Sequence, residues 1–292
     1  MATKTFTILL MQDHFLYLPL YYAASKKVNF FGFLPPKTAV RIVTVPEHTD
    51  EAVIRQLLSD SPDPARDPVP LFAFCDPARV CVGSHQYTVK PVILAGCIRN
   101  GAFWVINHSK NLTGSLSDLA RFDKIIAYHP GSTSYGIAKR ALNAAGILST
   151  ARIHCVHPPM EIPTLLLGAF ENSAALTPDA LGVTALLGRN LGHNIEFELS
   201  QAAEFRGVVT TALITRLDRL GAHPDVIVAV LAALQKAMFA VHALSDEVVT
   251  YASERFNANS VEDIRLALET VSEHRYRPMN AAIFTSARRR DQ

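Results

Sequence analysis

Short apolar runs alternate with amphipathic stretches through the first two thirds of the chain. Runs typical of buried strands lie at residues 5–11, 40–45, 70–74, 91–96, 103–107, 124–128 and 151–156. Apolar residues recur at helical spacing between several of these runs, at residues 18–27, 51–58, 115–120, 134–145 and 162–167. Strands and helices that alternate at this length predict an α/β fold with parallel sheets and helices on both faces.

The last third of the chain follows a different pattern. An apolar strand at residues 208–214 precedes three stretches with helical spacing, at residues 224–243, 245–255 and 260–273. We therefore expect a largely helical C-terminal region. Earlier in the chain, the strands at 91–96 and 103–107 flank the turn signal Arg99-Asn100-Gly101, which predicts that they lie on either side of a turn.

Composition and charge exclude two classes of protein. The 292 residues are 49% hydrophobic and only 18% charged, which favours a compact core over disorder. The net charge is +2, and the basic run Arg288–Arg290 stands alone at the C-terminus, so we expect no nucleic-acid partner.

The sequence also gives no sign of membrane insertion or of an export signal. Asp13 and His14 interrupt the first apolar stretch, and Gln235 ends the longest apolar run too soon to cross a bilayer. As it stands the sequence predicts a cytoplasmic protein, and a periplasmic one if a signal peptide has been removed.

The cysteines do not form a metal-binding pattern. None of Cys75, Cys81, Cys97 and Cys155 has C-x-x-C spacing, and their apolar neighbours favour buried, reduced thiols. A disulfide between Cys75 and Cys81 is the alternative for an exported protein. His154 and Cys155 are adjacent on a predicted strand and therefore point to opposite sides. We expect no metal and no cofactor.

The strongest local signal is the segment KIIAYHPGSTSYG at residues 124–136. A strand ends here, Pro130 and Gly131 turn the chain, and a helix begins at three hydroxyl residues, Ser132, Thr133 and Ser134. The first amides of a helix have no partner within it and stabilise an anion, such as a carboxylate or sulfonate. The alternative is that one of these hydroxyls only caps the helix.

Two other loops follow predicted strands and are candidate ligand contacts, because ligands of open α/β sheets bind beyond the carboxyl ends of the strands. Gln12, His14 and Tyr17 follow the first strand, while Cys75 and Asp76 follow the third. Asp76 precedes Pro77, which favours a role as a helix cap over a ligand contact. Aromatic residues that could form the walls of the site, or simply pack in the core, are Phe15, Tyr17, Phe74 and Tyr135.

The sequence lacks G-x-G-x-x-G, P-loop and G-x-S-x-G motifs. Ser134 with His14 or His129 is the one nucleophile-and-base combination to consider, and a serine at a helix start is more often a cap or a ligand contact. The residues themselves thus favour binding over catalysis.

Four stretches together resemble type 2 periplasmic substrate-binding proteins of the nitrate, aliphatic-sulfonate and thiamine-precursor group. They are YLPLYYAASKKVNFF at residues 17–31, IAYHPGSTSYG at 126–136, IPTLLLGAFE at 162–171, and TTALITRLD at 210–218 with HPDV at 223–226.

This resemblance implies a two-lobed fold with a hinge, in which residues 1–88 and 200–292 form the first lobe and residues 89–199 the second. It implies that the cleft between the lobes is faced by the loop residues named above and by Glu171, Thr210 and Thr211. It further implies a small-molecule ligand, of the sulfonate, carboxylate or thiamine-precursor class, and an ABC transporter permease as partner.

The same two-lobed fold is also similar to that of some cytoplasmic enzymes that act on thiamine-pyrimidine or menaquinone precursors. In that alternative, His14 in the cleft would act as an acid or base. Recovery of a ligand unchanged after incubation distinguishes a binding protein from such an enzyme.

Overall fold

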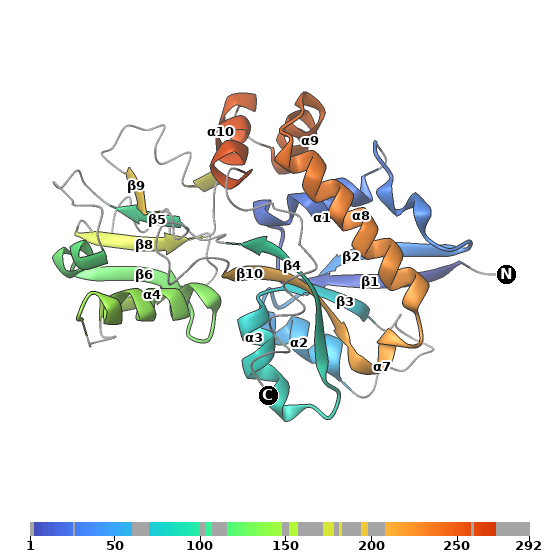
Figure 1. The fold of residues 1–292 in the computed structure, drawn as a ribbon, viewed down its shortest axis with the longest axis horizontal. Coiled ribbons are helices and arrows are strands. Elements are labelled where there is room, and N and C mark those ends of the chain that lie inside the picture. Colours follow the sequence, from blue (N-terminus) through green and yellow to red (C-terminus); the bar gives the residue numbers. More distant parts are fainter. Residues whose placement is uncertain are drawn as a thin grey trace, which may run out of the picture.

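Two sheets lie side by side in the computed structural model (Figure 1). The structure describes residues 3–25, 27–59, 70–99, 103–106, 116–147, 152–156, 172–177, 181–182, 194–197, 208–257 and 260–272. Within these ranges each sheet has five strands. We call the sheet that holds the N-terminal strand, with its helices, the first lobe, and the other sheet with its helices the second lobe.

The first sheet has the strand order β2-β1-β3-β10-β4. Its strands are β1 (Lys4–Leu10), β2 (Thr38–Thr44), β3 (Pro70–Cys75), β4 (Pro91–Arg99) and β10 (Val209–Arg216). β1 pairs with β2 and β3 in parallel, whereas β10 lies antiparallel to both β3 and β4. The sheet is therefore mixed, and the prediction of parallel sheets holds only for its N-terminal half.

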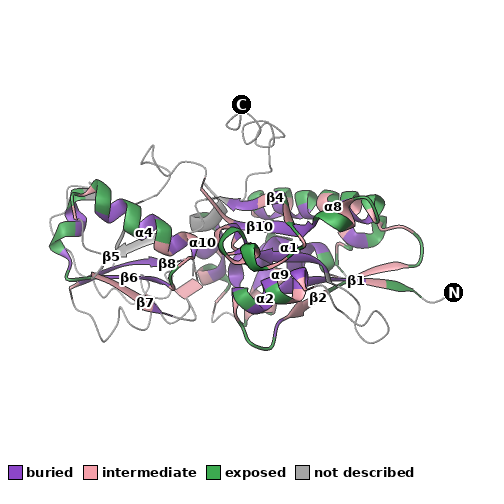
Figure 2. Cartoon of the chain, turned by 90° about the horizontal axis from the view of Figure 1, so that it is seen from below, coloured by how far each residue is buried: buried purple, intermediate pink, exposed green. Residues whose placement is uncertain are grey.

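Alternation along the strands divides the first lobe into two cores, because successive side chains of a strand point to opposite faces. Ile8 and Phe74 belong to a core with the helices on one face, and Leu9 and Cys75 belong to the core on the other. The first face is covered by α1 (Leu18–Ala24), α8 (Pro224–His242), α9 (Asp246–Phe256) and α10 (Val261–Ser272). The second is covered by α2 (Asp50–Leu58) and α3 (Pro77–Gly83). Figure 2 shows the buried strands of this sheet between the partly exposed helices.

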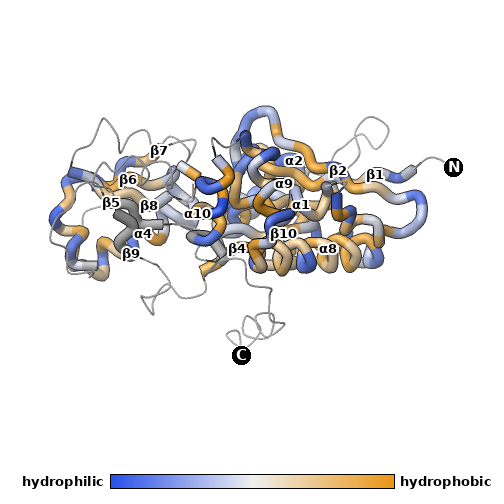
Figure 3. The backbone as a smooth tube through the Cα atoms, turned by 90° about the horizontal axis from the view of Figure 1, so that it is seen from above, coloured by the Kyte–Doolittle hydropathy of each residue, from blue (hydrophilic) through white to orange (hydrophobic). Residues whose placement is uncertain are grey.

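Helix α8 is the most apolar helix of the first lobe, as its colouring in Figure 3 shows. Among the described residues it is the one helix whose length and composition would suffice to span a membrane. Half of its most apolar stretch is buried inside the protein, where Val230 and Leu234 join the core that also contains α1. This packing is that of a core helix, although α8 is longer than the apolar run that the sequence analysis judged too short to cross a bilayer.

The second sheet has the order β7-β6-β8-β5-β9. Its strands are β5 (Phe103–Ile106), β6 (Lys124–Tyr128), β7 (Ile153–Val156), β8 (Ser173–Thr177) and β9 (Asn194–Phe197). α4 (Thr133–Ala144) packs Ile137 and Ala141 against Ile125 of β6 and against Phe122, which follows the 3-10 helix η4 (Leu116–Arg121). Other short helices in the described ranges include η1 (Phe15–Tyr17), η2 (Phe30–Phe33), η3 (Ser84–Gln86) and α7 (Leu217–Leu220).

The α/β class and the largely helical C-terminal region are confirmed. Three features differ from the sequence predictions. β4 and β5 do not pair around residues 99–101, because β4 pairs with β10 in the first sheet and β5 with β8 and β9 in the second. The predicted lobe boundary at residue 89 therefore does not coincide with the sheets. β8 and β9 were not predicted, and the predicted helix at 162–167 lies outside the described residues.

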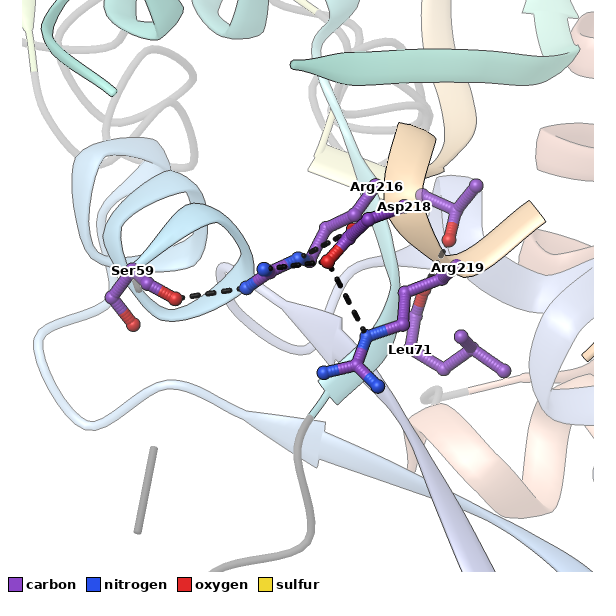
Figure 4. Close-up of polar contacts among 6 residues, drawn as sticks. Ser59, Leu71, Arg216, Asp218 and Arg219 are labelled. Atoms are coloured by element: carbon purple, nitrogen blue, oxygen red, sulfur yellow. Dashed lines mark hydrogen bonds and ion pairs between the residues drawn. The ribbon is translucent and has the colours of Figure 1, made fainter. Parts of the chain in front are cut away.

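A buried arginine at the C-terminal end of β10 forms hydrogen bonds with Asp218 and with Ser59, which follows α2 (Figure 4). Arg216, only 6% exposed, donates two hydrogen bonds to the carboxylate of Asp218, at 3.0 and 2.9 Å, and one to the carbonyl of Ser59 at 2.8 Å. Beside it, the hydroxyl of Thr215 donates to the carbonyl of Leu71 at 2.6 Å. These bonds lie at the end of β10 that is farther from the second lobe.

Candidate functional site

The turn between β6 and α4 has the strand, turn and helix that the sequence predicts. Ser132 caps α4, since its hydroxyl accepts a hydrogen bond from the amide of Tyr135 at 3.2 Å. The hydroxyls of Ser132 and Ser134 are 3.2 Å apart, and both residues are buried. The capping role that the sequence left open for one of the three hydroxyl residues thus belongs to Ser132.

Asp76 of the first lobe contacts the start of α4 in the second lobe. The amide of Thr133 donates to Oδ2 of Asp76 and its hydroxyl to Oδ1, both at 2.6 Å. Oδ1 also accepts from the amide of Ala78 at 2.8 Å, so Asp76 caps α3, as the alternative sequence interpretation predicted. One carboxylate therefore serves two helices in different lobes.

Two further contacts hold the same turn against the first lobe. The guanidinium of Arg79 donates to the carbonyl of Pro130 at 2.8 Å and forms an ion pair with Glu51. The hydroxyl of Tyr128 donates to the sulfur of Met11 at 3.0 Å. The turn at residues 128–133 is consequently one place where the described parts of the two lobes are in contact.

Gly131 fits this turn for two reasons. Its φ is +87°, in the region that favours glycine, and a Cβ placed there would lie 2.2 Å from Nη1 of Arg79. We expect Gly131→Ala to lower the free energy of unfolding by about 1–2 kcal/mol, because it strains the backbone and displaces Arg79. Urea unfolding measures the change. Gly136→Ala, at a helical position with open space around it, is the control, and an equal loss in both variants would contradict this account.

The structure also buries an acidic residue that the sequence analysis did not single out. Asp50, at the start of α2, is 2% exposed. Burial and the nearby charge of Asp76 raise its pKa from 3.8 to about 7, and the charge of Arg79 acts in the opposite direction. Burial also raises the pKa of Asp76, against the hydrogen bonds from Thr133 and from the amides of Ala78 and Arg79. Asp50 was missed because it follows Thr49 and looks like an ordinary acidic residue in a capped first turn.

Tyr17 and Cys75 are buried beside these acids. Burial and the charge of Asp50 raise the pKa of both groups well above their ordinary values, so both are neutral hydrogen-bond donors at physiological pH. The ring of Tyr17 packs edge-on against Phe74, with centroids 5.4 Å apart. All four cysteines are free thiols, and the alternative disulfide between Cys75 and Cys81 is absent from the structure.

The first loop follows β1 and begins at Met11, which contacts Tyr128 of the second lobe. Nδ1 of His14 accepts a hydrogen bond from the amide of Leu16 at 3.0 Å and so caps η1. Gln12, 5% exposed, directly follows Met11, which contacts Tyr128. Its buried Nε2 has no hydrogen-bond partner among the described residues. The side-chain amide of Gln12 could therefore donate a hydrogen bond to a ligand.

A cavity of about 410 Å³ lies between the lobes, next to the contact of Asp76 and Thr133. Its walls come from α3, from the N-terminal half of α4 and from the start of β10, and they include Cys81, Ser132, Thr133, Ile137, Arg140 and Val209. Most of these walls are apolar, and Arg140 supplies a cation. Of the predicted site residues, Ser132 and Thr133 line this cavity.

The other predicted residues divide into three groups. Asp76, Tyr17 and Cys75 meet around Asp50, as their shared electrostatic interactions show. Thr210 donates to the carbonyl of Ile98 at 3.3 Å, so this hydroxyl bonds within the first sheet, where Thr211 is also buried. Tyr135 is half-buried beside the cap of α4, and Glu171 lies outside the described residues.

Comparisons with known proteins reveal similarity at the level of structure. No family model and no curated protein sequence matches the chain. The alkanesulfonate-binding protein SsuA from Xanthomonas axonopodis pv. citri, solved with MOPS bound, superposes with a TM-score of 0.69 at 13% identity, covering 98% of this chain and 90% of that one. Escherichia coli SsuA, which binds aliphatic sulphonates, gives 0.67 at 14% identity, with 97% and 84% covered.

A third similar structure is the periplasmic nitrate-binding protein NrtA from Synechocystis PCC 6803. It has a TM-score of 0.64 at 15% identity and covers 89% of this chain and 69% of its own. At this level of identity the likeness shows the fold. The two-lobed architecture predicted from the sequence is thereby confirmed, and the chain has the fold of the periplasmic binding proteins.

Proposed function

We propose that this protein binds a small organic acid between its two lobes and serves as the substrate-binding component of an ABC-type uptake system. Proteins of its fold that bind sulfonates and nitrate support the general role. In this role an ABC permease is the partner, and an exported form of the protein works in the periplasm. Closure of two lobes around a ligand supplies the binding energy, through hydrogen bonds and apolar walls.

The observation that carries the proposal is the buried amide of Gln12. A buried donor without an acceptor costs about 1–3 kcal/mol. Gln12 directly follows Met11, which contacts Tyr128 of the second lobe, so an acceptor oxygen on a ligand held near this junction would recover that cost. A buried donor that has no acceptor among the described residues is therefore better explained by ligand binding than by stability.

The same reasoning favours an acidic ligand. Gln12 offers an N–H donor, and the start of α4 offers the amide and hydroxyl of Thr133, which bond to Asp76 in the structure. Arg140 adds a cation in the cavity that Thr133 lines. Carboxylate and sulfonate oxygens accept such bonds strongly. Ile137 and Val209 provide apolar contacts for the body of the molecule.

We expect Gln12→Leu to weaken binding of the best acid by roughly tenfold, since one hydrogen bond is lost. The ligand-free protein should keep or slightly gain stability, because the unpaired donor is gone. A thermal-shift screen of small carboxylates and sulfonates identifies the acid, and isothermal titration calorimetry measures its affinity for each variant.

Gln235→Leu, on the exposed side of α8, is the matched control and should bind like the unchanged protein. Equal affinity in the Gln12 variant would remove this residue from the site. Mass spectrometry of the recovered ligand completes the test, because a chemically converted product would indicate an enzyme instead of a binding protein.

A further inference from the structure

Asp76 occupies the position at the start of α4 where a ligand anion is expected. Both of its carboxylate oxygens are used, and the amide and hydroxyl of Thr133 bond to them at 2.6 Å. Hydrogen bonds to a carboxylate are about twice as strong as those between neutral groups. The first free N–H of α4 thus already has an anionic partner, supplied by the other lobe of the same chain.

The carboxylate of Asp76 can leave its contact with Thr133 without losing its other hydrogen bond. The charge of Asp50 is close enough to repel the carboxylate of Asp76. The hydrogen bond by which Asp76 caps α3, from the amide of Ala78, does not depend on the second lobe. The cavity beside it is lined by the same Thr133 and Ser132, so a small molecule can approach α4 from that side. Asp76 can therefore release Thr133 and still cap α3.

We propose that Asp76 is an internal substitute for the ligand's anionic group: it holds the empty lobes together through Thr133, and a bound anion displaces it. The displacement of Asp76 by a ligand rests on the proposed function, whereas the contact of Asp76 with Thr133 in the ligand-free protein does not. Asp76 is thus a specificity-determining residue. A ligand must offer at least two acceptor oxygens to replace both bonds, which selects carboxylates and sulfonates over neutral molecules.

The contact between the lobes is tested first, in the ligand-free full chain. Amide hydrogen exchange at Thr133 should become roughly tenfold faster or more in Asp76→Asn, because Ala78 and the Thr133 amide bond to different oxygens of Asp76 and asparagine keeps only one. Thr133→Val, which keeps the amide but loses the hydroxyl, should show a smaller acceleration at the same position. Both variants should also shift small-angle scattering toward a larger radius of gyration.

Asp246→Asn is the matched control, because this carboxylate is 92% exposed and pairs with Arg265 far from the contact. It should leave both measurements unchanged. Unaltered exchange at residue 133 in Asp76→Asn would overturn the inference. An unchanged circular dichroism spectrum identifies the variants that fold. Thr133→Val tests the same contact independently, because it changes the residue that donates to Asp76.

Displacement is then tested with ethanesulfonate and propionate, alongside ethanol as the neutral probe. Asp76→Asn should bind the two anions roughly tenfold or more tightly than the unchanged protein does, since the competitor is weakened. Equal or weaker anion binding in this variant would overturn displacement. Faster exchange with no anion binding in any variant would leave the lobe contact standing and contradict the proposed ligand class.

Discussion

Replacing Asp50 by Asn should raise the free energy of unfolding by about 4 kcal/mol at a pH of about 8, the largest effect that we predict. The pKa of this carboxyl is about 7 in the folded protein against 3.8 in its ordinary environment. A neutral amide of similar shape avoids the burial of a charge at the start of α2. Urea unfolding at several pH values measures the change.

The sign of the pH dependence follows from the direction of the shift. The pKa is raised on folding, so the contribution of Asp50 to stability is fully present below about pH 4 and is lost as the pH rises to about 7. The unchanged protein should lose stability over this range. In Asp50→Asn this loss should disappear, and near pH 4 the two proteins should be nearly equal.

Asp225→Asn serves as the control, since this exposed residue also stands in the first turn of a helix. It should change stability by a few tenths of a kcal/mol at either pH. Parallel pH profiles for the unchanged protein and Asp50→Asn would show that the buried carboxyl does not cause the loss.

Asp218→Ala should lower the free energy of unfolding by about 3 kcal/mol, because among the described residues the buried guanidinium of Arg216 would keep the carbonyl of Ser59 as its acceptor (Figure 4). Asp218 itself is about half exposed, at 48%, so the cost comes from the arginine and not from the carboxylate. Hydrogen bonds from Arg216 lower the pKa of Asp218, and this stabilisation is lost only in acid.

A double-mutant cycle with Arg216→Met separates the two contributions. In the methionine background, Asp218→Ala should cost little, since no buried cation remains. Chemical unfolding of all four proteins gives the coupling energy. Equal costs in both backgrounds would mean that the pair is not coupled and would refute the explanation.

The sequence predicted local structure well where one element decides the pattern. The spacing of Val53, Ile54, Leu57 and Leu58 predicted the buried face of α2, and the turn at Gly131 with the cap at Ser132 was found where the residues indicated it. These features depend on neighbours within about one helical turn, so they can be seen in a linear sequence.

Features that join distant parts of the chain were not predicted from residue patterns. The bonds between Asp76 and Thr133 connect residues 57 positions apart, and each residue also has an ordinary local role at a helix start. The environment of Asp50 arises in the same way, because its burial and its neighbours Asp76 and Arg79 depend on the packing of α2 against α3. The partner of β4 could not be predicted, because the residues after it resemble a local turn, whereas β10 pairs with it from more than a hundred residues away.

The placement of β10 also sets an order of events for a growing polypeptide. This strand is inserted between β3 and β4, yet it is synthesised after all the strands of the second sheet. A chain that emerges from the ribosome can therefore complete the second sheet while β3 and β4 still lack their common neighbour. Their unpaired edges are a target for chaperones and for misassociation until residues 209–216 arrive.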